Sequence, residues 1–102
     1  MMEERRRYVR WGVGERKSVV ISYRGNKEHA IMLDISAGGM RIISSRPLDI
    51  GTSLYGEVEI LTAMGPFFII GRVERVNESS EGWEIAVVFE KVSTIPLKTP
   101  WN

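Results

Sequence analysis

The feature that most constrains the fold is a series of six short β-type runs that recur at intervals of about ten residues. Glycine, proline, asparagine and serine separate the runs, as is typical of turns. No window of eleven or more residues shows a convincing helical period, so the chain is expected to be all-β. The predicted strands are SVVISYR (18–24), HAIMLDIS (29–36), MRIISS (40–45), TSLYGEVEI (52–60), PFFIIGRVERV (66–76) and GWEIAVVFE (82–90).

The alternation within these runs predicts strands with one apolar face. In residues 52–60, Leu54 and Val58 face one way, while Tyr55 and Glu57 face the other. Such strands need closure or a second layer to cover the apolar face. A chain of 102 residues has room for one domain. We therefore predict a six-stranded antiparallel β-barrel. In the last strand, the residues expected on one apolar face are Trp83, Ile85, Val87 and Phe89.

The composition disfavours several classes of function. The chain has no cysteine, which excludes disulfides and thiolate metal sites. No apolar run approaches the roughly 18 residues of a membrane-spanning helix, and no secretory signal is recognisable. The single histidine, His29, begins a predicted strand and has no metal-ligand spacing around it. We expect a cytoplasmic protein, or a domain of one, that is not an enzyme, holds no metal or cofactor and does not insert into membranes.

The N-terminal segment carries the positive charge of the chain. Residues 1–17 hold six basic and three acidic side chains, whereas residues 18–102 hold eight and ten. Four of the basic residues are the arginines of EERRRYVR (3–10). A guanidinium presents a planar fork of donors that fits phosphate oxygens and the O6/N7 edge of guanine. Residues 1–14 are expected to form a flexible arm. A solvated basic tail, or an arm that binds nucleic acid without sequence preference, would have the same composition.

A second candidate segment is LDISAGGMRI, residues 33–42. Asp34 and Ser36 lie two positions apart at a strand end, so their side chains share a face. Residues 37–39 follow as a turn of small residues that a ligand could approach closely. A carboxylate can accept hydrogen bonds from guanine N1–H and N2–H₂, and a hydroxyl can bond a base or a phosphate. The alternative is a hairpin turn in which Asp34 and Ser36 bond to their own backbone.

Together the two segments resemble the motifs of the PilZ domain family, the bacterial receptors for cyclic di-GMP. The family carries an RxxxR motif in an N-terminal arm, and here RRYVR supplies Arg6 and Arg10. It carries a [D/N]xSxxG motif on the barrel, and here DISAGG supplies Asp34, Ser36 and Gly39. The resemblance covers residue 4 to about residue 92.

The resemblance implies an arm over residues 1–14, a barrel over residues 15–92 and a short tail over residues 93–102. It places the ligand on the outer face of the barrel, under the arm. An arginine before RxxxR, as Arg5 is here, accompanies binding of two stacked cyclic di-GMP molecules in the family. Arg75 stands where many members place a residue, often tryptophan, that packs against a guanine. The expected cyclic di-GMP-binding residues are Arg5, Arg6, Arg10, Asp34, Ser36, Gly39 and Arg75.

The function implied is that of a cyclic di-GMP receptor that couples ligand binding to a conformational change and regulates a protein partner or a fused domain. Two alternatives remain open. The first is a small β-barrel that binds nucleic acid, which the net acidic body of the chain disfavours. The second is a PilZ-like adaptor that binds partners without any ligand, which the intact motifs disfavour.

Overall fold

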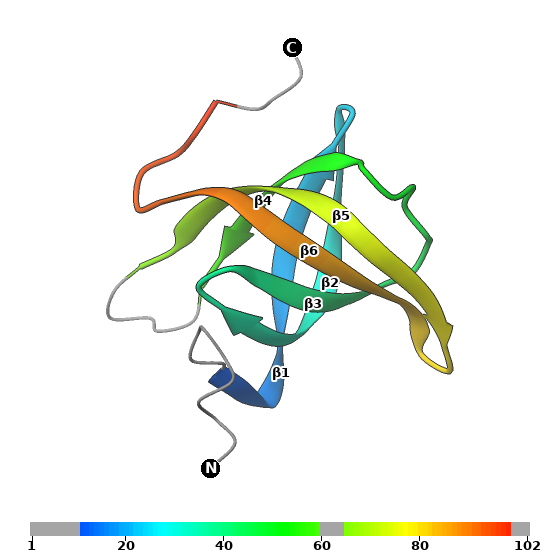
Figure 1. The fold of residues 1–102 in the computed structure, drawn as a ribbon. Helices are drawn as coiled ribbons and strands as arrows, with labels where there is room; N and C mark the ends of the chain where they lie inside the picture. The colour runs from blue at the N-terminus through cyan, green and yellow to red at the C-terminus, as the bar shows by residue number, and fades with distance from the viewer. Residues whose placement is uncertain (1–10, 60–64, 99–102) are drawn as a thin grey trace.

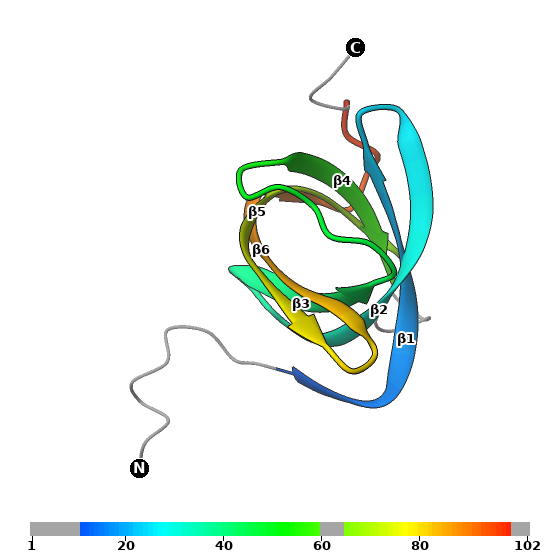
Figure 2. The same cartoon turned by 90° about the vertical axis from the view of Figure 1, so that its right-hand side faces the viewer.

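Six antiparallel strands close into a barrel (Figures 1 and 2) in the computed structural model, which describes residues 11–59 and 65–98. The strand order around the barrel is β1-β2-β3-β6-β5-β4, and the described residues include no helix. Closure leaves no sheet edge in need of a covering layer. The strands are β1 (Trp11–Tyr23), β2 (Asn26–Ser36), β3 (Gly39–Ser44), β4 (Ser53–Val58), β5 (Phe67–Ser79) and β6 (Gly82–Ser93).

The predicted barrel and its six strands are confirmed, but the first strand is longer than the sequence pattern indicates. β1 begins at Trp11, within the segment expected to form the arm, because its first residues pair with the end of β2. Trp11 pairs with Ile35 and Gly12 with Asp34, and the regular register resumes only at Lys17. The irregular stretch between Gly12 and Lys17 separates this short pairing from the apolar run that begins at residue 18. Alternation therefore cannot reveal the pairing.

The core fills the inside of the barrel with alternate residues from all six strands. Leu54 and Val58 have no exposed surface, as their alternation predicts. Ile85 and Val87 are buried as well, and Trp83 and Phe89 pack against the core, which confirms the predicted inward face of β6. Burying one such aliphatic side chain stabilises the fold by about 1.5–3 kcal/mol. The remaining core residues are Val19, Ile21, Tyr23, Ala30, Met32, Ile35, Met40, Ile42, Ile69 and Val73.

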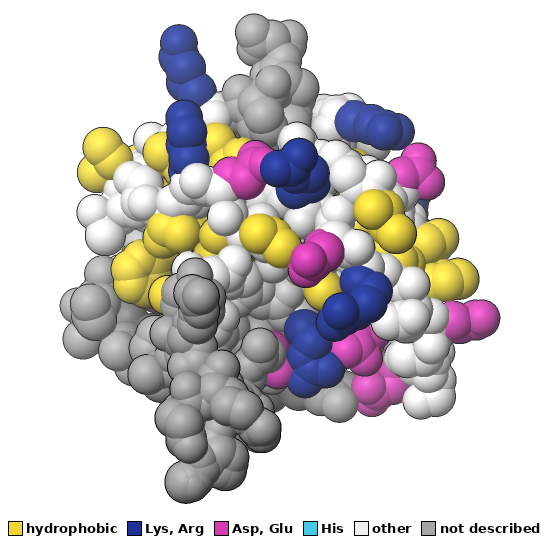
Figure 3. All heavy atoms as spheres, in the orientation of Figure 1, with side chains coloured by type: hydrophobic (Ala, Val, Ile, Leu, Met, Phe, Trp, Pro, Cys, Tyr) yellow, Lys and Arg dark blue, Asp and Glu magenta, His cyan; other side chains and the backbone are white. Residues whose placement is uncertain are grey.

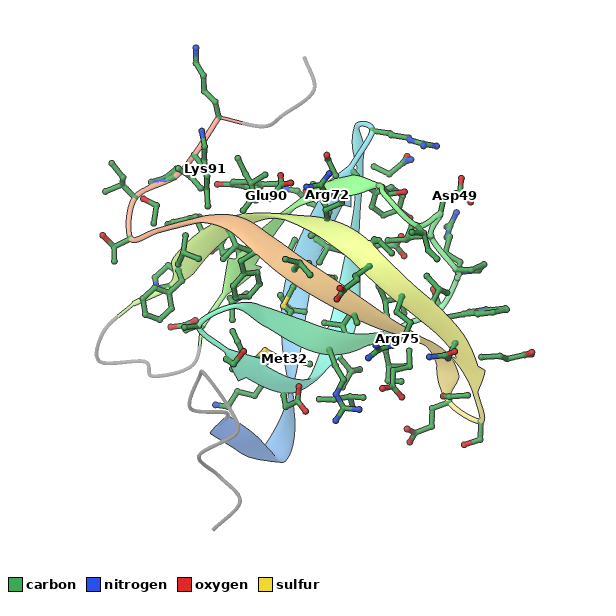
Figure 4. All side chains as sticks on the ribbon, viewed as in Figure 1. Met32, Asp49, Arg72, Arg75, Glu90 and Lys91 are labelled. Carbon is green, nitrogen blue, oxygen red and sulfur yellow. The ribbon has the colours of Figure 1, made fainter. Side chains whose placement is uncertain are left out.

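A bulge in β2 decides which side chains of its C-terminal half face outward. Met32 pairs with Ile42, but Asp34 pairs with Arg41, so β2 holds one extra residue at this point. Met32 points into the barrel, and an unbroken alternation would direct Asp34 inward as well (Figure 4). The extra residue instead brings Ile35 into the core and leaves Asp34 on the outer face.

The opposite end of the β1–β2 pair carries a buried phenol. Tyr23 is 7% exposed, and its hydroxyl donates a hydrogen bond to the carboxylate of Glu28. Burial, followed by the hydrogen bond to Glu28, raises the pKa of Tyr23 above its ordinary value. The folded protein therefore favours the neutral phenol, and this contribution to stability should be lost as the pH rises through the raised pKa.

Candidate ligand-binding site

A row of paired residues crosses the outer face of the barrel and brings together charged side chains from distant parts of the sequence. Gly12 of β1 pairs with Asp34, Asp34 with Arg41 of β3, Arg41 with Ala86 of β6, and Ala86 with Arg75 of β5. Directly paired residues of an antiparallel sheet share a face. The row therefore places Asp34, Arg41 and Arg75 on one surface, and Figure 4 shows Arg75 on β5 at this face.

A shallow hollow lies beside this row. Its volume is about 360 Å³, and it is centred on the turn between β2 and β3 and on the neighbouring part of β6. Carboxylates and guanidinium groups are interspersed over the described part of this face (Figure 3). The hollow therefore offers donors and acceptors as well as apolar floor. Its lining residues are Ser36, Gly38, Gly39, Met40, Arg41, Glu74, Val87 and Val88.

The row contains an ion cluster built on Asp34, Arg41 and Glu84. Arg41 donates two hydrogen bonds to one oxygen of Asp34, from Nε at 3.0 Å and from Nη2 at 2.6 Å to Oδ2. Its remaining terminal nitrogen, Nη1, donates to Oε2 of Glu84 at 2.7 Å. The side chain of Asp34 is only 10% exposed, so these charge-assisted bonds compensate for the loss of its hydration. The cluster thus supplies hydrogen bonds to a carboxylate at an almost buried position.

The two carboxylates also act on the guanidinium. The hydrogen bond to Asp34 raises the pKa of Arg41, and the bond to Glu84 adds to this effect, while burial opposes it. The side chain of Arg41 is 39% exposed, so it lies between the buried carboxylate and solvent. Arg41 was not among the residues predicted from the sequence. Its position two residues beyond Gly39 in the predicted strand is the only sequence signal for an outward-facing side chain. Only the register of the sheet shows which carboxylates it binds.

Ser36 bonds within its own turn, as the structural alternative predicts. Its Oγ lies 3.4 Å from the carbonyl oxygen of Gly39, to which it donates, and 3.4 Å from the amide nitrogen of Gly38, from which it accepts. Both contacts are long for hydrogen bonds, so they restrain the hydroxyl only weakly. The hydroxyl borders the hollow and can turn toward a ligand there.

Gly39 has a packing role that the motif alone does not disclose. A Cβ at this position would lie 2.3 Å from the carbonyl oxygen of Val87 in β6. Only glycine therefore lets β3 approach β6 at this point. The same absence of a side chain keeps the floor of the hollow open, because Gly39 is one of its lining residues.

The predicted arginines divide into one that the structure places and three that it does not. Arg75 is exposed and lies two strands away from Arg41 in the row, at about 10 Å by the usual strand spacing. Arg5, Arg6 and Arg10 lie outside the described residues. The first described residues after them are Trp11 and Gly12, and Gly12 pairs with Asp34.

Neither a metal-ligating cluster nor a membrane-spanning helix is found in the described part of the chain. Residues 11–59 and 65–98 contain no group of three or more side chains able to hold a metal ion. Over the same residues, no helix is long and apolar enough to cross a membrane.

Several solved structures share this fold, including three with TM-scores of 0.70, 0.65 and 0.62. The Bacillus subtilis inhibitor of motility (MotI/DgrA) matches with a TM-score of 0.70 and 21% identity, over 87% of this chain and 44% of that one. The PilZ domain of YcgR from Escherichia coli, solved with c-di-GMP, matches with a TM-score of 0.65 and 18% identity, over 85% and 79%. The Borreliella burgdorferi PlzA protein, solved in complex with c-di-GMP, matches with a TM-score of 0.62 and 20% identity, over 86% and 35%.

These likenesses agree with the barrel topology described above. This chain spans less than half the length of the PlzA and MotI chains that it matches. No curated protein sequence matches it. A sequence model describes the family as the PilZ domain, and it matches residues 4–99, which include both the arginine motif and the whole described barrel. The chain therefore belongs to the PilZ domain family.

Proposed function

We propose that this chain is a receptor module for cyclic di-GMP and that the ligand binds the outer face formed by β2, β3, β6 and β5. The observation that carries the proposal is the register of β1 against β2. Because Gly12 pairs with Asp34, the arginine motif ends within two residues of the position opposite that carboxylate. This register supports the proposal that donors for phosphate and acceptors for guanine meet on one surface.

Each proposed residue contacts a particular part of the ligand. Asp34 accepts from the N1–H and N2–H₂ groups of a guanine, and Ser36 bonds the same base or a phosphate. Arg6 and Arg10 bind phosphate oxygens or the O6/N7 edge of guanine, and Arg75 stacks on a base.

The backbone and one apolar side chain complete the proposed surface. Gly39 lets the ligand approach the sheet backbone. Val88 is 39% exposed within the hollow and offers an apolar contact to a base face.

The ligand assignment is supported by the ligand found in solved structures of the same fold. The PlzA and YcgR structures hold c-di-GMP on the same fold, and this chain retains both motifs of the family. Arg5 adds a third guanidinium beside Arg6 and Arg10. Two stacked ligands carry four phosphate charges, more than Arg6 and Arg10 alone could neutralise. Because Arg5 supplies a further guanidinium, we propose that each chain binds two cyclic di-GMP molecules.

The proposed output is a change of surface rather than a chemical reaction. Binding would fix the N-terminal segment across the outer face of the barrel and so alter what a protein partner or a fused domain meets. The name of the Bacillus subtilis relative, inhibitor of motility, is consistent with action through a partner. The module would act by binding alone, without catalysis.

The test is a calorimetric titration of the full chain with cyclic di-GMP, with cyclic di-AMP and single-stranded RNA as comparison ligands. We expect saturable binding of cyclic di-GMP and weaker binding of cyclic di-AMP, because adenine lacks the two adjacent donors that Asp34 accepts. Absence of cyclic di-GMP binding would overturn the proposal. RNA binding that cyclic di-GMP does not compete with would favour the nucleic-acid alternative.

A further inference from the structure

The carboxylate proposed to accept guanine already accepts hydrogen bonds from another side chain of the barrel. Arg41 places both Nε and Nη2 on Oδ2 of Asp34, at 3.0 and 2.6 Å. One carboxylate oxygen has about two acceptor sites, so these two donors saturate Oδ2. Only 10% of the Asp34 side chain is exposed. A guanine that places N1–H and N2–H₂ on both oxygens of Asp34 must therefore displace Arg41 from one of them.

We propose that Arg41 is a displaceable guanidinium that competes with guanine for Asp34 and thereby sets the ligand concentration at which the module responds. The inference rests on the proposed function and goes beyond it. Guanine supplies two N–H donors to Asp34 in exchange for those that Arg41 withdraws from Oδ2, so the carboxylate remains bonded after the exchange. Arg41 acts on the ligand through Asp34 and is in this sense an affinity-setting residue.

Glu84 gives the displaced side chain a place to go. Arg41 Nη1 is bonded to Glu84 Oε2 at 2.7 Å, and Glu84 is 30% exposed, three times as much as Asp34. When Arg41 leaves Asp34 it keeps this second partner and moves toward solvent. Because the exposed position is hydrated, the move leaves no unpaired buried charge.

The exchange affects guanine and adenine ligands differently. A guanine ligand forms hydrogen bonds to Asp34, but the protein loses its contact between Asp34 and Arg41. An adenine ligand has no pair of donors for Asp34, so it binds with that contact closed. Weakening the contact should therefore strengthen binding of cyclic di-GMP and leave binding of cyclic di-AMP unchanged. If Arg41 instead oriented Asp34 for the ligand, weakening the contact would reduce cyclic di-GMP binding.

Arg41→Lys separates the two cases. Lysine keeps the positive charge but cannot donate the two hydrogen bonds that Arg41 makes to Oδ2 of Asp34. We expect cyclic di-GMP to bind this variant about threefold more tightly than it binds the wild type, the size expected for weakening a partly exposed ion pair. The same substitution made in an Asp34→Ala background should have no effect. Arg46→Lys is the matched control, because Arg46 is 70% exposed and its salt-bridge partner is Glu28, toward the other end of β2.

A second measurement uses the wild-type protein and needs no variant. The Nε–H signal of Arg41 in a ¹⁵N–¹H spectrum should show a bonded, exchange-protected proton in the free protein. It should lose that protection on saturation with cyclic di-GMP. This signal decides the matter if Arg41→Lys does not fold, or if Asp34→Ala binds too weakly for its affinity to be measured.

The outcomes are distinct. If the wild type does not bind cyclic di-GMP, the proposed function fails and this inference fails with it. If the wild type binds but Arg41→Lys binds no more tightly, only the exchange is wrong. It is also wrong if the gain persists without Asp34, or if the Nε–H signal of Arg41 keeps its protection in the saturated complex.

Discussion

Replacing Gly39 with alanine should destabilise the barrel itself, although Gly39 belongs to the proposed ligand motif. The new Cβ would lie 2.3 Å from the carbonyl oxygen of Val87, more than 1 Å inside the optimal separation of about 3.5 Å. Both groups lie on paired strands, since Gly39 of β3 pairs with Val88 of β6. Relief therefore requires movement of backbone, not rotation of a side chain.

The expected cost follows from that geometry. Overpacking that shifts backbone costs about 1–3 kcal/mol, and in a domain of about 100 residues each kcal/mol lowers Tm by about 4–8 °C. Thermal unfolding followed by circular dichroism should therefore show Tm lowered by roughly 10 °C. Cyclic di-GMP affinity should fall as well, because the displaced strand borders the hollow.

Gly56→Ala is the matched control. It also lies inside a strand, but the atoms nearest to its Cβ would be side-chain atoms of Ile69, at 3.1 Å. The nearest backbone atom, the carbonyl oxygen of Val20, would lie at 3.8 Å, an ordinary van der Waals distance. A shift of the Ile69 side chain by a few tenths of an ångström would relieve this contact, and alanine reduces the entropy of the unfolded chain, so Tm should fall much less than in Gly39→Ala. Equal Tm values for the two variants would refute the argument that Gly39 is required by the approach of β3 to β6.

Four further outcomes are expected. Arg6→Ala and Arg10→Ala should each weaken cyclic di-GMP binding at least about tenfold in calorimetry and leave Tm unchanged, because each loses a charge-assisted contact worth roughly 1.5–3 kcal/mol. Unchanged affinity in both variants would remove these arginines from the proposed site. Asp34→Ala should abolish the preference for cyclic di-GMP over cyclic di-AMP, and equal binding of both by the wild type would contradict the role of that carboxylate. Titration at protein concentrations well above the dissociation constant should give two ligands per chain, and the ratio should move toward one in Arg5→Leu. A wild-type ratio of one that Arg5→Leu leaves unaltered would contradict this role of Arg5. The free energy of unfolding should fall above about pH 10, where the unfolded chain releases a phenolic proton that folded Tyr23 retains. If Tyr23→Phe leaves this pH profile unchanged, Tyr23 is not the group responsible.

The barrel could be predicted because its strands alternate strongly. Each run that places residues such as Leu54 and Val58 inside is specified by its own sequence, and closure follows from six such faces in a short chain. The early start of β1 at Trp11 could not be predicted. It depends on pairing with Ile35 across an irregular stretch, and no local pattern records that pairing.

The candidate site divides in the same way. The motifs identify Asp34 and Ser36, and the two-residue spacing correctly indicates that they share a face. The bulge that turns Asp34 outward becomes visible only when Met32 is seen in the core. Arg41 was missed because its partners, Asp34 and Glu84, are brought to it by two different neighbouring strands. Contacts of that kind depend on register, which the sequence specifies only through the assembled sheet.

Backbone amide chemical shifts, followed during a titration with cyclic di-GMP, would locate the ligand residue by residue. If cyclic di-GMP binds the outer face over β2, β3, β6 and β5, the largest shifts should fall on Asp34, Ser36, Gly39 and Val88. The β1–β2 turn at Arg24, near the other end of β2, should remain unshifted. Shifts centred on that turn, or spread evenly over the barrel, would show that the ligand does not bind this face.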